Sequence, residues 1–210
     1  MKILYVYDAL CGWCYGFSDV ISRFHEKYNS SLDFEVISGG MVVGGRVGEI
    51  GKVASYISSA YKDVERISGV KFGSKFLDST LKDGKTIFTS TPPAIAMSIF
   101  KEINKNKQVQ FACELQKAIY FEGLAPKNLE TYVHVVSIFG IDAQSFVLKM
   151  KNQRYKLLAE KDFRLTATLG LSGFPSVLLK LDGTYFIIGT GYLSFNQLEQ
   201  NYLAIKKTII

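Results

Sequence analysis

The spacing of apolar positions changes twice within the first part of the chain. Lys2 to Asp8 is a run of mostly β-branched and aromatic residues, which is typical of a buried strand. Leu32 to Ser38 alternates between apolar and polar residues and stops at Gly39-Gly40, so a second strand is expected there. Between the two strands, apolar residues recur with the spacing of one helix face: Phe17, Val20, Ile21, Phe24 and Tyr28. This segment therefore predicts a strand, a helix and a second strand.

Helical spacing predominates from Val47 to Lys156. A first helix is expected from the apolar stripe Val47, Ile50, Val53, Ala54, Ile57 and Tyr61. The pattern is broken between about Gly69 and Phe88. A later stripe is apolar except for one glutamine and comprises Val109, Ala112, Cys113, Gln116, Ile119 and Tyr120.

Helix-capping residues mark the starts of the remaining helices. Thr91 with Pro92 and Pro93 is typical of a first helical turn, with Ser90 or Thr91 as the N-cap. Further helices are expected after Asn128 and Asp142, and from about Tyr155 to Leu169 with Gly170 just beyond the end.

The last part of the chain returns to strands. Ser176 to Leu181 and Tyr185 to Ile188 flank Asp182-Gly183, a dipeptide that favours a two-residue hairpin. Leu193 to Ile205 has the spacing of a closing helix. The chain shows no internal repeat and no linker-like segment, so an α/β fold with one large helical insertion is expected.

Composition and charge add few constraints. The 210 residues suffice for one core, with room for an inserted subdomain. The net charge of +6 includes basic clusters at Lys101 to Lys107 and Lys149 to Lys156, which we interpret as solvated helix faces. We therefore expect no nucleic-acid partner. No apolar run approaches the roughly 18 residues of a bilayer span, and the first strand begins where a secretory signal would lie. We expect no membrane partner and a cytoplasmic location.

Two cysteines, Cys11 and Cys14, flank Gly12-Trp13 at the junction between the first strand and the first helix. Because a structural zinc site needs about four ligands and no partner set stands at metal-like spacing, we expect no metal. A cysteine at a helix N-terminus is favoured as a thiolate, which is the nucleophile of disulfide exchange. Cys11 is then expected to attack, and Cys14, one turn further on, to resolve the mixed disulfide.

A second motif stands near the end of the chain. Gly173-Phe174-Pro175-Ser176 runs directly into a predicted strand. A proline there indicates either an edge or bulge position or a cis peptide bond at the strand start.

Together, the CGWC turn and the late GFPS segment resemble the thioredoxin superfamily. The long helical block between them resembles DsbA-like oxidoreductases, and YDALCGWCYGF resembles their cytosolic FrnE-type branch. The resemblance implies a discontinuous thioredoxin-fold domain of residues 1–44 and 157–210, with an inserted helical domain of residues 45–156.

The resemblance also implies roles for individual residues. Cys11 would be the nucleophile, Cys14 the resolving thiol, and Pro175 a cis-proline that faces the pair beside Phe174. The sequence departs from the family at Ala9, where proline is common, and at Trp13, where periplasmic DsbA has histidine. Gly12 and Trp13 would shape the site.

Three further residues are considered as site candidates: Asp8, Cys113 and His25. Asp8, three residues before Cys11, is either a carboxylate that acts on the thiols or a turn former at a strand end. Cys113 is expected to be a core thiol, and His25 to complement a helix C-terminus.

The sequence thus predicts a thiol–disulfide oxidoreductase acting on protein or small-molecule disulfides. It requires no cofactor, and its electron donor or acceptor is unidentified, with glutathione as one candidate. Two alternatives stay open. One is a glutathione-dependent enzyme similar to kappa-class transferases or 2-hydroxychromene-2-carboxylate isomerases. The other is a polypeptide-binding, chaperone-like module.

Overall fold

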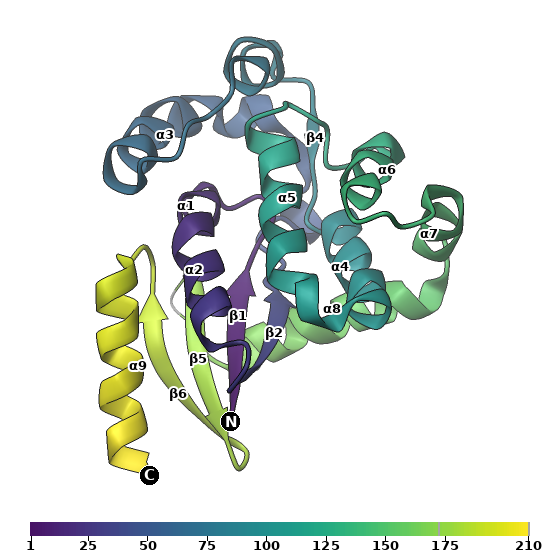
Figure 1. Cartoon of the computed structure of the whole chain (residues 1–210). Coiled ribbons are helices and arrows are strands. Elements are labelled where there is room, and N and C mark those ends of the chain that lie inside the picture. Colours follow the sequence, from purple (N-terminus) through teal and green to yellow (C-terminus); the bar gives the residue numbers. More distant parts are fainter. Residues whose placement is uncertain (172, 210) are drawn as a thin grey trace.

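The computed structural model describes residues 1–171 and 173–209. A sheet of four strands lies between helices on both of its faces, and further helices extend beyond the end at which β1 finishes (Figure 1). The strand order is β2-β1-β5-β6, with β1 parallel to β2 and antiparallel to β5. The strands of this sheet are β1 (Lys2–Tyr7), β2 (Asp33–Ser38), β5 (Ser176–Leu181) and β6 (Thr184–Thr190).

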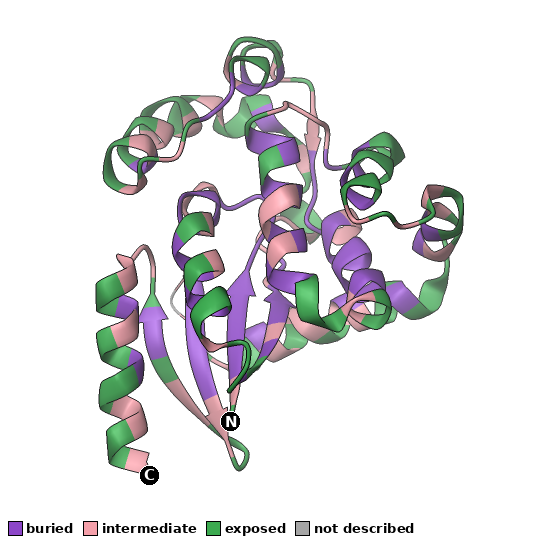
Figure 2. Cartoon of the chain, viewed as in Figure 1, coloured by how far each residue is buried: buried purple, intermediate pink, exposed green. Residues whose placement is uncertain are grey.

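The two faces of β1 bury different side chains, because successive residues of a strand point to opposite sides. Tyr5 and Tyr7 pack with Phe17 in the large core between the sheet and the helix that follows the cysteines. Leu4 and Val6 belong to a smaller core on the opposite face. Figure 2 shows β1 as almost continuously buried.

The predicted hairpin is confirmed. Asp182 and Gly183 have φ values of 47° and 85°. They form the two-residue turn between Leu181 of β5 and Thr184 of β6, which are paired with each other in the sheet. Both residues of a type I′ turn need positive φ, and aspartate and glycine adopt that conformation most readily.

The helices match most of the predicted periodicity. A short helix carries the second cysteine, and the helix after it buries Val20, Ile21 and Phe24, as predicted. The α-helices are α1 (Gly12–Gly16), α2 (Ser18–Tyr28), α3 (Ala54–Ser68), α4 (Thr91–Ile103), α5 (Gln108–Tyr120), α6 (Leu129–Ile138), α7 (Ala143–Met150), α8 (Gln153–Thr168) and α9 (Phe195–Ile209). Helical turns of other types are η1 (Gly44–Arg46), η2 (Ile50–Val53), η3 (Lys75–Leu81) and η4 (Lys105–Lys107).

The predicted start of the first insertion helix, at Val47, is wrong. The backbone there pairs with a distant segment: Ile50 N–H donates to the Thr86 carbonyl, and Gly51 N–H donates to the Gly84 carbonyl. These bonds extend a short ladder between β3 (Gly48–Glu49) and β4 (Ile87–Phe88), so α3 begins only at Ala54.

Of the two predicted N-cap residues of α4, Ser90 and Thr91, the structure places Ser90 at that position, but Ser90 does not act as a side-chain cap. Ser90 occupies the N-cap position of α4, but it has helical backbone angles and its side chain makes no capping bond. Its hydroxyl donates instead to the buried carboxylate of Asp8, 2.9 Å away. By contrast, Asp142 caps α7 as predicted, accepting from the N–H of Ser145.

One residue of the basic clusters is not on a solvated face. Lys101 of α4 pairs with Asp162 of α8 at 2.9 Å, and the two side chains are only 19% and 14% exposed. Asp162 also accepts from the N–H of Ser38 at the end of β2. The prediction that the basic clusters lie on solvated helix faces was therefore wrong for Lys101. Its ion pair joins α4 to α8, and Asp162 in turn connects α8 to β2.

The predicted domain boundaries stay predictions. The sheet is built from the two ends of the chain, and α8 begins at Gln153, before the expected boundary at residue 157. Among the residues that the structure describes, no helix has both the length and the apolar character needed to cross a bilayer.

Candidate active site around the cysteine pair

A four-residue turn carries Cys11 from β1 into α1. The N–H of Cys11 donates to the carbonyl of Asp8 at 3.1 Å, which closes the turn. Cys11 then forms the N-cap of α1, with its Sγ accepting from the N–H of Cys14 at 3.2 Å. The sulfur atom thus occupies the place that a serine or aspartate oxygen takes at most helix starts.

The two thiols differ in access. Cys11 is 6% exposed and borders a cleft, whereas Cys14 is fully buried behind it. Burial is the main cause that raises the pKa of Cys14 well above its usual range, and the neighbouring Cys11 raises it further. An incoming disulfide can therefore reach Cys11 before Cys14.

The late motif lies against the first cysteine. The thiol of Cys11 donates to the carbonyl of Phe174 at 3.7 Å. The Phe174–Pro175 peptide bond is cis, and the Pro175 carbonyl accepts from the N–H of Gly191 at the end of β6. The ring of Phe174 lies so close to Gly39 that a Cβ there would come within 2.4 Å of it.

Asp8 is a structural centre of the site. Its carboxylate is buried and accepts from the N–H groups of Leu10 and Met41 and from the hydroxyl of Ser90. Burial raises its pKa, although these donors lower it in part. The structure is consistent with both interpretations of Asp8: its carboxylate joins the turn to residue 41 and to the start of α4, and its charge is among the causes that raise the pKa of Cys14.

Gln116 of α5 contacts the same turn, and the sequence did not identify it as a site residue. Its Nε2 donates to the carbonyls of Asp8 at 3.2 Å and Cys11 at 3.4 Å, and the side chain is fully buried. The available signal was its place as the one polar residue of an otherwise apolar stripe. One turn later, Tyr120 stacks on Tyr15 and also borders the cleft.

A mostly apolar cleft of about 650 Å³ opens beside Cys11. Trp13 and Phe174 border it near the thiol, and Trp13 also packs against Tyr192. Ile57 and Tyr61 of the predicted apolar stripe line the cleft, together with Val64 of the same helix, α3. The charged lining residues are Arg46, Glu49 and Lys52.

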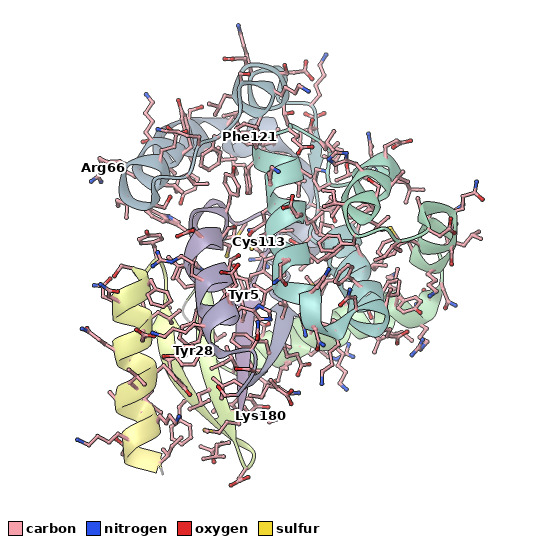
Figure 3. All side chains as sticks on the ribbon, viewed as in Figure 1. Tyr5, Tyr28, Arg66, Cys113, Phe121 and Lys180 are labelled. Atoms are coloured by element: carbon pink, nitrogen blue, oxygen red, sulfur yellow. The ribbon has the colours of Figure 1, made fainter. Side chains whose placement is uncertain are left out.

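The remaining candidates lie outside the cleft. Cys113 is labelled in Figure 3 and lies between α5 and α2, where its Sγ contacts the Ser22 hydroxyl and the Ser18 carbonyl. Burial raises its pKa. His25 lies in the last turn of α2, as expected, and is buried against Phe34, where burial lowers its pKa.

Nowhere in residues 1–171 and 173–209 do three or more His, Cys, Asp or Glu side chains gather closely enough to hold an ion. His134 pairs with Glu122 at 2.7 Å on the surface.

Comparison with solved structures places this geometry in a known fold. A candidate protein disulfide isomerase from Nitrosomonas europaea superposes with a TM-score of 0.89 at 21% identity, over 100% of both chains. The chain has the DsbA-like fold. A cytosolic disulfide reductase from Pseudomonas aeruginosa, DsbM, matches with a TM-score of 0.82 at 23% identity, over 99% of this chain and 98% of DsbM.

A more distant match is a 2-hydroxychromene-2-carboxylate isomerase, with a TM-score of 0.63 at 13% identity, over 99% of this chain and 96% of that one. No family model and no curated protein sequence matches the chain. The predicted fold, a thioredoxin fold with an inserted helical domain, is thus confirmed by structural similarity.

Proposed function

We propose that the chain is a thiol–disulfide oxidoreductase that cycles Cys11 and Cys14 between a dithiol and a disulfide. One observation carries the proposal: Cys11 borders the apolar cleft and faces the Phe174 carbonyl, while Cys14 lies buried directly behind it. This order of access is what a nucleophile followed by a resolving thiol requires.

The reaction in the reducing direction has two exchange steps. The Cys11 thiolate attacks one sulfur of a substrate disulfide, which forms a mixed disulfide and releases the other sulfur as a thiolate that takes up a proton. Cys14 then loses its proton and attacks the Cys11 sulfur, which forms the Cys11–Cys14 disulfide and releases the second substrate thiol. The substrate gains two electrons, and two external thiols must later reduce the pair.

The cleft favours a substrate with apolar groups next to its sulfur atoms. Trp13, Phe174 and Tyr120 offer aromatic surface near Cys11, and burial of such surface is a source of binding free energy. Protein or small-molecule disulfides both meet this description.

Two solved structures of DsbM support a location and a redox partner for the proposal. DsbM is described as a cytosolic disulfide reductase, and one of its structures contains glutathione (TM-score 0.79, 22% identity). We therefore propose a cytoplasmic location and glutathione as a redox partner. We also propose that the exchange needs no metal or organic cofactor and that the chain has no nucleic-acid or membrane partner.

Single cysteine variants test the proposal. We expect the wild-type chain to reduce a model disulfide with a thiol donor, Cys11→Ser to be inactive, and Cys14→Ser to accumulate a mixed disulfide with the substrate, visible by mass spectrometry. Cys113→Ser is the matched control and should keep wild-type activity. Full activity of Cys11→Ser would reject the proposal.

The isomerase match favours a second candidate, a glutathione-dependent transferase or isomerase. Such an enzyme would use Cys11 to hold glutathione and would have no need of Cys14. Transferase or isomerase activity that survives Cys14→Ser, in a chain with no disulfide reductase activity, would support this candidate over the first.

A further inference from the structure

We propose that Gln116 is a positioning residue of the redox turn and tunes the equilibrium between the Cys11–Cys14 dithiol and disulfide. This inference rests on the proposed function. Gln116 lies one helical turn before Tyr120 on α5, but its side chain is not part of the cleft lining, so it would act only through the turn.

Gln116 contacts both ends of the turn that carries Cys11. Its Nε2 donates to the carbonyl of Asp8, the first residue, and to that of Cys11, the last residue. The Asp8 carbonyl also accepts from Cys11 N–H, and the Cys11 carbonyl accepts from Tyr15 N–H in the first turn of α1. One amide group therefore fixes the backbone on both sides of the nucleophile.

The Oε1 atom of Gln116 indicates that a glutamine stands at this position because of its contacts with the turn. Gln116 is fully buried, and its Oε1 has no hydrogen-bond partner among the described residues. An unpaired buried oxygen is unfavourable, and an apolar residue would fill the same place in this apolar stripe without that cost. The Nε2 contacts with the turn are what a leucine or methionine would lack.

Gln108, on the same helix, shows the contrasting case. It is also buried, but its Oε1 accepts from Val36 N–H at 2.7 Å and its Nε2 donates to the carbonyls of Phe34 and Lys105. All of these contacts join α5 to β2 and to η4, the turn directly before α5. Gln108 is therefore a structural anchor away from the cysteines and provides a matched control.

Two physical effects connect the contacts to redox chemistry. The fixed turn holds the Cys11 sulfur toward the cleft and the Phe174 carbonyl, the geometry needed for attack. Both Nε2 contacts are also made in the structure in which Cys11 and Cys14 are free thiols, so they stabilise the turn in its dithiol form. Without Gln116, the disulfide form gains relative to the dithiol.

Gln116→Met keeps the side-chain volume and removes the donors. We expect its equilibrium with glutathione to shift toward the disulfide by about tenfold, which corresponds to a reduction potential lower by about 30 mV. We also expect a several-fold slower alkylation of Cys11 and a lower kcat with KM unchanged, because no cleft residue is altered. Gln108→Met should leave all three quantities at wild-type values.

Gln116→Glu supplies a second readout. The introduced carboxyl can donate to the turn only while it is protonated, so this variant should approach wild-type behaviour at low pH and lose it as pH rises. The Gln116→Met defect should stay constant over the same range. A purely structural role would produce no such difference, and urea unfolding of each variant establishes that folded protein is compared.

The outcomes separate this inference from the proposed function. A wild-type chain that forms no Cys11–Cys14 disulfide in glutathione buffers rejects the proposed function and the inference with it. A wild-type chain that cycles normally, with folded Gln116 variants within twofold of it in equilibrium constant and alkylation rate, rejects the inference alone.

Discussion

The Cys11 thiol donates to the Phe174 carbonyl at 3.7 Å, although 163 residues separate the two in the sequence. The contact joins the turn after the first strand to the segment before the third strand of the sheet. It also defines one end of the apolar cleft, because both residues border it. The candidate site thus forms where the pairing of β1 with β5 brings the two segments together.

Trp13 should report the redox state of the pair. It stands between the two cysteines and is the only tryptophan of the chain. We expect its fluorescence to fall when Cys11 and Cys14 form a disulfide, because a disulfide quenches a nearby indole. Titration in glutathione buffers would then give the equilibrium constant, and a double Cys11→Ser, Cys14→Ser variant should show no redox-dependent signal.

Gly39→Ala should displace the ring of Phe174. An added Cβ would lie 2.4 Å from that ring, so the side chain or its backbone must shift. We expect a loss of about 1–3 kcal/mol in the free energy of unfolding and a clear loss of reductase activity. Gly45→Ala is the stability control, since no atom lies within 4 Å of its added Cβ. Equal stability of the two variants would contradict this prediction.

Asp8 should make the stability of the fold depend on pH. Burial raises its pKa, so the folded chain holds this proton more tightly than the unfolded chain. The stabilisation from that proton is fully present below the unfolded pKa of about 3.9 and is lost as pH rises through the folded-state pKa.

Unfolding of Asp8→Asn, compared with the wild-type chain across this window, tests the effect. The free energy of unfolding of the wild-type chain should fall relative to that of the variant, with a slope of up to about 1.4 kcal/mol per pH unit. A difference that is the same at every pH would show that the proton on Asp8 does not contribute.

Lys101→Met should destabilise the chain through Asp162. The two side chains are largely buried, and removing the cation leaves the carboxylate with the Ser38 N–H as its remaining donor in the described structure. We expect a loss of roughly 2–4 kcal/mol in urea unfolding. Arg66→Met removes one partner of the exposed Arg66–Asp63 pair and should cost less than about 1 kcal/mol. Similar losses in the two variants would contradict the role of burial.

The sequence predicted the parts of the site whose signals are local. The Asp182-Gly183 hairpin and the apolar face of α2 follow from residues a few positions apart, and both are confirmed. Cys11 and Cys14 were identified in the same way, because CGWC stands at the end of a predicted strand. Their assignment as a redox pair stays a prediction.

The roles of Ser90, Gln116 and the α3 stripe depended on the tertiary structure. Ser90 has the sequence context of a helix cap, yet its hydroxyl bonds a carboxylate that lies 82 residues earlier. Gln116 was visible only as a polar exception, since its acceptors belong to a turn more than 100 residues away. The stripe that begins at Val47 has helical spacing, but pairing with residues 84–88 keeps its first part extended or tightly turned.

The sequence by itself thus determined the four strands of the main sheet, most helix faces and the position of the cysteine pair, because periodicity and turn chemistry act over a few residues. Only the tertiary structure decided which groups surround the pair. The hydrogen bonds that Ser90 and Gln116 donate to Asp8, and the cleft wall formed by α3, depend on packing between elements that are distant in the chain. No local pattern specifies such partners.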